Sequence, residues 1–163
     1  MAEIQEQGGA DTQDAPERVP ERRTGSLERL AALVASRNET LVRYSILAGI
    51  RPYETHPETA EALRRFCQAL VDYAATAHFQ LYRYLADGRE RRQAVLAVAR
   101  EVYPLIAAST DAILDFNDRY DPALIDTDRL QALEEDLSRL GEVLAERIQM
   151  EDRIIQALGG RVR

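Results

Sequence analysis

The sequence predicts an all-α protein, a four-helix bundle core of long antiparallel helices with a disordered N-terminal extension. Ala, Leu, Arg and Glu dominate the chain after residue 25, while Gly and Pro number only 8 and 6 in 163 residues. This composition favours helix. Apolar residues recur at helical spacing in four long segments, and no stretch alternates apolar and polar residues as a strand would. The chain length suits a single domain.

Residues 1–25 form the predicted extension and residues 26–163 the predicted helical-bundle domain. The extension contains Gly8, Gly9, Pro16 and Pro20 with many charges and no aromatic residue. Such a composition cannot bury enough apolar surface to fold. It has no apolar stretch of the kind that a signal peptide requires, and no run approaches the roughly 18 apolar residues of a membrane helix. We therefore expect a cytoplasmic location.

The first two predicted helices have recognisable ends. The first runs from about Ser26, a suitable N-cap, to about Ala48, before Gly49. The second opens with the capping-box pattern Thr55-His-Pro-Glu58, which carries Pro in its first turn, and runs to about Ala86. Short connections of this kind favour antiparallel neighbours in a bundle.

The other two predicted helices follow a short connection. The third covers roughly Glu90 to Phe116 and contains Pro104, which should kink or break it because proline lacks the N–H and crowds the preceding turn. The fourth begins at an Asp126 or Thr127 cap and ends near Leu158, before two glycines. Its apolar residues repeat close to heptad spacing, which indicates a coiled-coil-like core: Leu130, Leu133, Leu137, Leu140, Leu144, Ile148, Ile155 and Leu158.

The segment FCQALVDYAATAHFQLYRYL, residues 66–85, has one predicted core face. A helix turns about 100° per residue, so nine residues fall within about 60° of Leu70: Leu63, Phe66, Cys67, Tyr73, Ala74, Ala77, Leu81, Tyr84 and Leu85. Cys67 is therefore predicted to be a small core residue and not a nucleophile. His78 lies at about 80°, on the flank of this face, where we expect a hydrogen-bonded structural side chain.

The opposite side of the same helix carries a strip of residues that do not fit a core. It comprises Gln68, Asp72, Ala75, Phe79 and Tyr82, with Phe79 at about 180° from Leu70. Burying Phe is worth roughly 1.5–3 kcal/mol, so an outward Phe is either covered by another segment, such as residues 1–25 or 115–126, or binds a partner. An exposed aromatic among polar groups is typical of an interface. Both interpretations stay open from the residues alone.

Charge is distributed unevenly along the chain. Residues 26–100 hold 11 Arg against 8 Asp and Glu, a net of +3, whereas residues 101–158 hold 5 Arg against 14 Asp and Glu, a net of −9. The whole chain carries −7, which argues against direct nucleic acid binding, because that binding depends on neutralising phosphates. An acidic half suits a basic protein partner, although a solvated surface explains the same charges. We expect no membrane or small-molecule partner.

An enzymatic or metal-binding bundle is the main alternative. Glu151 falls on the apolar stripe of the fourth helix, and a core carboxylate needs a partner such as His78 or an arginine. A di-iron bundle requires Glu-x-x-His on two helices, and neither His56 nor His78 has Glu three residues before it. One cysteine excludes a Cys-based zinc site, and no nucleotide-binding or nucleophile motif is present. We therefore predict no catalytic residue, metal or cofactor, and a structural role for Glu151.

The 66–85 segment also resembles the Rsd/AlgQ family of bacterial regulators, whose members carry Phe-Cys-Gln-x-Leu-Val-Asp-Tyr followed by His-Phe. Three other stretches are similar to that family: LVRYSILAGI at 41–50, FNDRYD at 116–121 and LGEVLAERIQMEDRII at 140–155. The resemblance covers about residues 26–158. It implies an all-helical fold built around a four-helix bundle.

The resemblance also implies an anti-sigma factor, which binds the C-terminal, promoter-reading domain of the primary sigma factor and blocks its use by core RNA polymerase. It implies that Asp72 and Phe79 belong to the sigma-contacting surface, and we expect Tyr82 and Gln68 at its rim. The chain departs from its relatives in having no Trp, and Ala75 stands where relatives carry Ser. A helical adaptor for another basic protein remains the alternative.

Overall fold

The described structure consists of helices joined by turns and short connections, and contains no strand. This computed structural model describes residues 18–86, 88, 90–121 and 125–159, with side chains from residue 28 onward. None of the described helices is long and apolar enough to span a membrane. The elements are α1 (Arg18–Gly49), α2 (Pro57–Ala77), the π-helical turn η1 (His78–Tyr82), α3 (Arg83–Ala86), α4 (Gln93–Arg119) and α5 (Thr127–Ala157).

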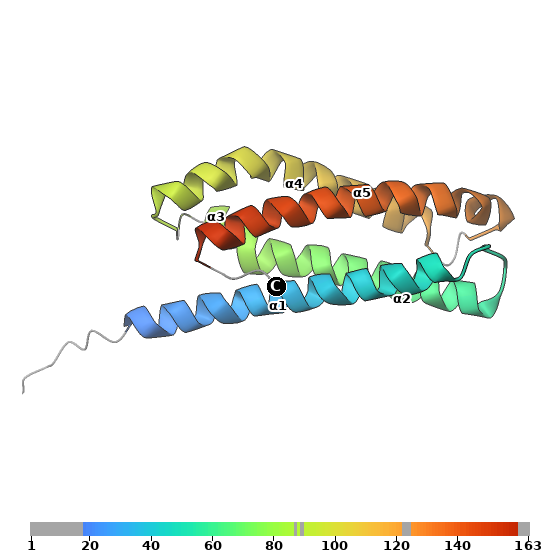
Figure 1. Ribbon diagram of the computed structural model, residues 1–163, viewed down its shortest axis with the longest axis horizontal. Coiled ribbons are helices and arrows are strands. Elements are labelled where there is room, and N and C mark those ends of the chain that lie inside the picture. Colours follow the sequence, from blue (N-terminus) through green and yellow to red (C-terminus); the bar gives the residue numbers. More distant parts are fainter. Residues whose placement is uncertain (1–17, 87, 89, 122–124, 160–163) are drawn as a thin grey trace, which may run out of the picture.

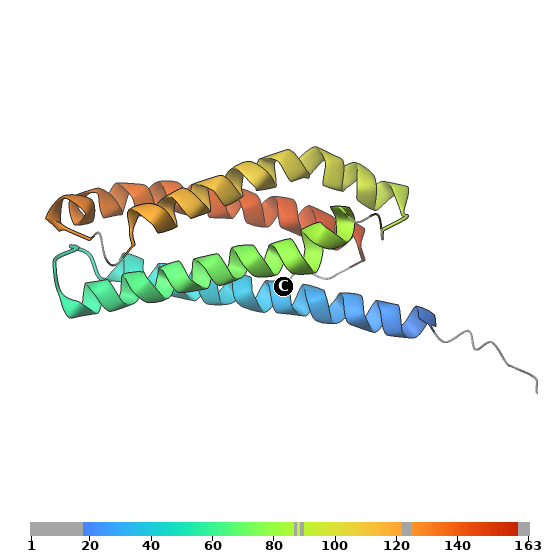
Figure 2. The same cartoon turned by 180° about the vertical axis from the view of Figure 1, so that it is seen from behind.

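The four long helices form two antiparallel pairs. α1 packs mainly against α2, and α4 packs mainly against α5. Figures 1 and 2 show the two pairs facing each other, with each long helix running opposite to the one before it. The predicted all-α four-helix bundle is confirmed. Its core lies between the pairs and contains residues from all four helices, including Leu33, Leu47, Phe66, Leu70, Val102, Ile106, Ile113, Leu133 and Leu140.

The first helix begins earlier than the sequence predicts. α1 starts at Arg18 and not at Ser26, so its backbone is helical over residues 18–25, the last part of the predicted extension. Pro20 is compatible with this start, because the first backbone N–H groups of a helix have no intrahelical acceptor to lose. The N-terminal turns of α1 project beyond the rest of the bundle (Figures 1 and 2). The remainder of the predicted extension, residues 1–17, lies outside the described residues.

The second helix begins without the predicted capping box. Pro57 occupies its first turn and His56 is the N-cap, with no side-chain hydrogen bond at the cap. The backbone of the residue before a proline is pushed into the extended region, and His56 has φ −101° and ψ 148°. This places the helix boundary one residue later than a Thr55 cap would.

A π-helical turn interrupts the second helix at residues 78–82, after which α3 continues to Ala86. A π turn accommodates one more residue than an α turn. Residues beyond it therefore lag by about 100° behind their positions on a regular wheel. Tyr82, expected on the outer strip, is consequently rotated inward and is 5% exposed.

The third and fourth helices follow the prediction more closely. α4 continues through Pro104, so the expected break does not occur, and the helix is bowed (Figure 1). α5 begins after Asp126, whose side chain accepts a hydrogen bond from the backbone N–H of Arg129 at 2.9 Å. It ends before Gly159, whose φ of +85° is a conformation that favours glycine. The predicted cap and stop of this helix are confirmed.

Cys67 is a buried core residue, as the wheel predicts. Burial raises the pKa of its thiol to about 12, so almost no reactive thiolate is present at pH 8. We expect the folded chain to react with iodoacetamide at least about 100-fold more slowly than the chain unfolded in guanidinium, where a free thiol has a pKa near 8.5. Mass spectrometry over time measures both rates. Equal rates would contradict the core placement.

Candidate partner-binding site

The outer strip of the second helix lies on the surface at four of its five predicted positions. Phe79 is 60% exposed, more than any other large hydrophobic side chain in the described part of the chain. Gln68, Asp72 and Ala75 are also exposed. The Gln68 side-chain amide donates to Asp72 Oδ1 at 3.1 Å. No described segment covers Phe79. The described residues of the 115–126 connection therefore do not pack over its ring, which was one of the two interpretations of the sequence.

Two predicted site residues are placed differently. Tyr82 does not belong to the rim, because the π turn buries it and its hydroxyl donates to Glu151 Oε1 at 3.1 Å. His78 is exposed and forms no hydrogen bond with the described residues, so it is not a structural polar residue. Its ring packs edge-on against Phe79, with ring centroids 5.1 Å apart. His78 therefore enlarges the exposed aromatic surface.

Phe79 borders a groove between α2–η1 and α4, here called the α2–α4 groove. Its volume is ≈ 390 Å³. The α2–η1 wall includes Ala75 and Phe79. The α4 wall includes Tyr103, Ala107 and Leu114. The alanines on both walls leave space between the helices, while Tyr103 and Leu114 are 47% and 45% exposed. The surface is thus an apolar groove with large side chains along its edges.

The α4 wall was not predicted, and the sequence contains only a weak signal for it. On a wheel of α4 with Ile106 at zero, Tyr103 and Leu114 fall at about 60° and 80°, beside the buried stripe and on the same side. By the criterion applied to the second helix, Tyr103 falls at the edge of the core face and Leu114 on its flank, so the wheel alone marks neither residue as outward. A wheel also cannot show that α2 and α4 lie on opposite sides of one groove.

One carboxylate lines the groove, and two others lie on the same two helices outside its lining. Asp72 lies on α2, and Asp111 lines the α4 wall. Asp118 lies seven residues further along the same side of α4, about 10.5 Å along the helix axis. None of the three forms an ion pair with another described residue. Their charges are therefore available to a cationic partner.

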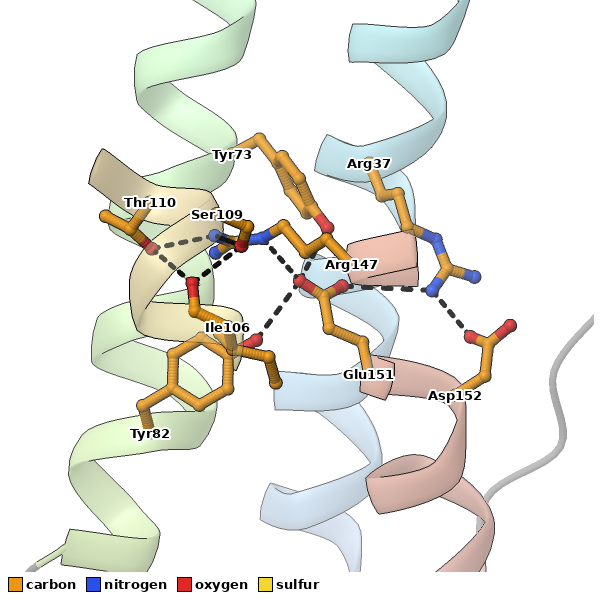
Figure 3. Close-up of polar contacts among 9 residues, drawn as sticks. All are labelled: Arg37, Tyr73, Tyr82, Ile106, Ser109, Thr110, Arg147, Glu151 and Asp152. Carbon is orange, nitrogen blue, oxygen red and sulfur yellow. Dashed lines mark hydrogen bonds and ion pairs between the residues drawn. The ribbon is translucent and has the colours of Figure 1, made fainter. Parts of the chain in front are cut away.

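A buried polar cluster lies beneath η1 and is centred on Glu151 (Figure 3). Glu151 is fully buried on α5. Its Oε1 accepts hydrogen bonds from the hydroxyls of Tyr73 at 2.5 Å and Tyr82 at 3.1 Å, and from Nε of Arg147 at 2.9 Å. Burial raises the pKa of both tyrosines, and the Glu151 charge raises it further. Both phenols therefore stay protonated and donate.

The two arginines of the cluster connect it to the other helices. Arg147 is 1% exposed and donates from α5 to the hydroxyls of Ser109 at 3.0 Å and Thr110 at 2.7 Å, both on α4. Arg37, on α1, lies 3.9 Å from Glu151 Oε2 and donates to Asp152 at 2.7 Å. All four long helices thus contribute to one buried cluster (Figure 3).

This geometry does not fit a metal site. His78 is exposed while Glu151 is buried, so the two do not converge, and two guanidinium groups already occupy the surroundings of the carboxylate. In the described ranges, no three His, Cys, Asp or Glu side chains are placed to hold a metal ion. Glu151 is the hydrogen-bonded core carboxylate that the sequence predicts, with arginine and tyrosine as its partners.

The sequence of the chain is similar to those of bacterial regulators. A family model described as "Regulator of RNA polymerase sigma(70) subunit, Rsd/AlgQ" matches residues 14–159. A protein named regulator of sigma D from Yersinia enterocolitica is 34% identical over 143 residues, which cover 86% of each chain. Another of that name from an Enterobacter species is 36% identical over 141 residues, which cover 85% of each chain.

Proposed function

Because this chain belongs to the Rsd/AlgQ family of regulators of the RNA polymerase sigma(70) subunit, we propose that it is an anti-sigma factor. In this proposal it binds the C-terminal, promoter-reading domain of the primary sigma factor. The complex then withholds that domain from core RNA polymerase and from promoter DNA. The relatives are named as regulators of sigma D, and the choice of domain and the blocking of core RNA polymerase follow what the family resemblance implies.

The single observation that supports the proposal is the outward position of Phe79 beside Asp72. An aromatic side chain with 60% of its surface exposed supplies an anchor of the kind that dominates interface energies. Asp72 can accept a charge-assisted hydrogen bond from Arg or Lys of the partner. Ala75, between them on the helix surface, permits close approach of the partner's backbone.

The mechanism we infer is steric sequestration helped by charge. A domain that reads DNA carries cationic side chains for the phosphates. The same cations are attracted to the acidic second half of this chain, which carries a net of −9 over residues 101–158. Binding here and binding to promoter DNA therefore compete for one surface of the sigma domain.

A calorimetric titration tests this proposal. We expect the full chain to bind the isolated C-terminal domain of the primary sigma factor with 1:1 stoichiometry and not to bind the remaining sigma domains. We also expect it to displace that domain from promoter DNA in a fluorescence competition assay. Absence of binding would favour the alternative of a helical adaptor for another basic protein. A ternary complex of this chain, the sigma domain and promoter DNA would contradict sequestration.

Electrostatic attraction predicts a dependence on salt. Raising the salt concentration from about 50 to about 500 mM should slow association with the sigma domain by at least about tenfold, because screening weakens the long-range attraction. The dissociation rate should change less, since short-range packing governs it. Stopped-flow fluorescence measures both rates. An association rate that does not depend on salt would remove charge from the mechanism.

A further inference from the structure

We propose that the α2–α4 groove receives an amphipathic, basic helix of the sigma factor, and that α4 supplies half of the binding site. Tyr103 and Leu114 are the apolar contacts of this second wall, and Asp111 is its acceptor for a cation. The inference rests on the proposed function. It adds to that function three residues on α4 that neither the family resemblance nor the names of the relatives indicate.

The shape of the groove fits a helix. Its walls are two antiparallel helices (Figures 1 and 2), so the groove runs along their common direction. Phe79 on one wall faces the same space as Tyr103 and Leu114 on the other, with alanines between them. A helix with apolar residues at i, i+3, i+4 and i+7 places a ridge of side chains in such a groove.

The length of the groove also fits a helix. The rings of Tyr82 and Tyr103 lie 6.2 Å apart at one end, and Val71 and Leu114 line the other. Tyr103 and Leu114 are eleven residues apart, which corresponds to about 16 Å along α4. A partner helix of about three turns spans this distance and brings two or three apolar side chains into contact.

Charge selects the kind of helix. Asp111 lines the groove, Asp72 and Asp118 lie on its two helices outside the lining, and none of the three pairs with a cation among the described residues. Arg100 lies on the same side of α4 at the Tyr103 end, about 20° from Asp111 by helical geometry. The partner helix is therefore basic where it passes the carboxylates. A second copy of this chain would bring like charges together at this groove, which is unfavourable.

The floor of the groove is held in place by the buried cluster. Tyr82 and Thr110 both line the groove. The first donates to Glu151, and the second accepts from Arg147 at 2.7 Å. A surface fixed in this way loses little freedom on binding, which favours affinity.

Substitutions on α4 test the second wall by titration with the isolated C-terminal sigma domain. We expect Tyr103→Ala and Leu114→Ala each to raise Kd about tenfold, because each removes an apolar contact. Asp111→Arg should raise Kd by about tenfold or more and weaken the salt dependence of association. Two matched controls should stay within about twofold of the unaltered chain: Leu105→Ala, a 54% exposed leucine on the other side of α4, and Glu142→Arg, an exposed carboxylate on α5.

A thiol footprint locates the partner directly. Because Cys67 is buried and its pKa is raised to about 12, iodoacetamide at pH 8 should label only an introduced thiol. The saturating sigma domain should slow labelling of Leu114→Cys by at least about tenfold and leave Leu105→Cys unchanged.

The outcomes separate the two proposals. Full affinity of all three α4 variants together with an unprotected thiol at position 114 would overturn the groove. If Phe79→Ala still weakens binding in that case, the proposed function stands on the α2 wall alone. If the unaltered chain does not bind the sigma domain, the proposed function itself fails.

Discussion

Replacing Glu151 with Ala should lower the free energy of unfolding by about 3–5 kcal/mol, the cost of leaving a buried charge without its partner. Arg147 is fully buried and its Nε donates to Glu151, so its charge would lose compensation in a site that water does not reach. The hydroxyls of Tyr73 and Tyr82 would lose their acceptor as well. Guanidinium unfolding at pH 7, followed by circular dichroism, measures the loss.

Two further variants show whether the loss comes from charge. Glu142→Ala removes an exposed carboxylate from the same helix and should change the free energy of unfolding by less than about 0.5 kcal/mol. Combining Glu151→Leu with Arg147→Met removes this buried ion pair, while Arg37 keeps Asp152 as its partner, and should recover a large part of the loss, because apolar replacement of a whole buried pair is often close to neutral. A Glu151→Ala variant as stable as the unaltered chain would mean that the cluster does not hold the helices together.

The buried cluster also explains which features the sequence could predict. The four helices follow from a periodicity that belongs to each segment by itself, and the heptad stripe of α5 needs no knowledge of its neighbours. Phe79 was placed outward for the same reason, because the wheel stays regular as far as the π turn. The fold class and the outer position of Phe79 are therefore local properties of the sequence.

Tyr82 and Arg147 mark where local reasoning ends. A wheel assumes a constant rotation per residue, but the π turn inserts one residue between Ala77 and Arg83. Tyr82 then faces the core, where its hydroxyl donates to Glu151, 69 residues away in the sequence. Arg147 lies three residues after Leu144, on the heptad stripe, yet charged residues are almost never fully buried unless paired. The burial of Arg147 is explained only by its partners, which include Ser109 and Thr110 on another helix.

The α4 wall was missed for a related reason. Tyr103 and Leu114 fall at the margin of the core face on a wheel of α4, and an exposed apolar residue by itself carries little information, since most protein surfaces contain some. Their significance comes from lying opposite Phe79 across one groove. That relation depends on the packing of two helices and cannot be read from either of them.

Phe79→Ala should weaken binding to the C-terminal sigma domain by at least about 2 kcal/mol, a rise in Kd of about 30-fold, as truncation of a central aromatic anchor does. The free energy of unfolding should stay within about 0.5 kcal/mol of the unaltered chain, because 60% of the ring surface is already exposed. Calorimetric titration measures the first quantity and guanidinium unfolding the second.

The control for this variant is Val42→Ala, which truncates a 53% exposed side chain on α1, away from the α2–α4 groove, and should leave Kd within about twofold. Because Phe79 and Leu114 line opposite walls of one groove, their double variant should deviate from additivity by more than about 0.5 kcal/mol, as residues sharing a partner do. Unchanged affinity for Phe79→Ala would contradict the anchor, whereas full additivity would mean that the two walls contact separate parts of the sigma domain. A loss of stability equal to the loss of binding would instead make Phe79 part of the fold, which its exposure argues against.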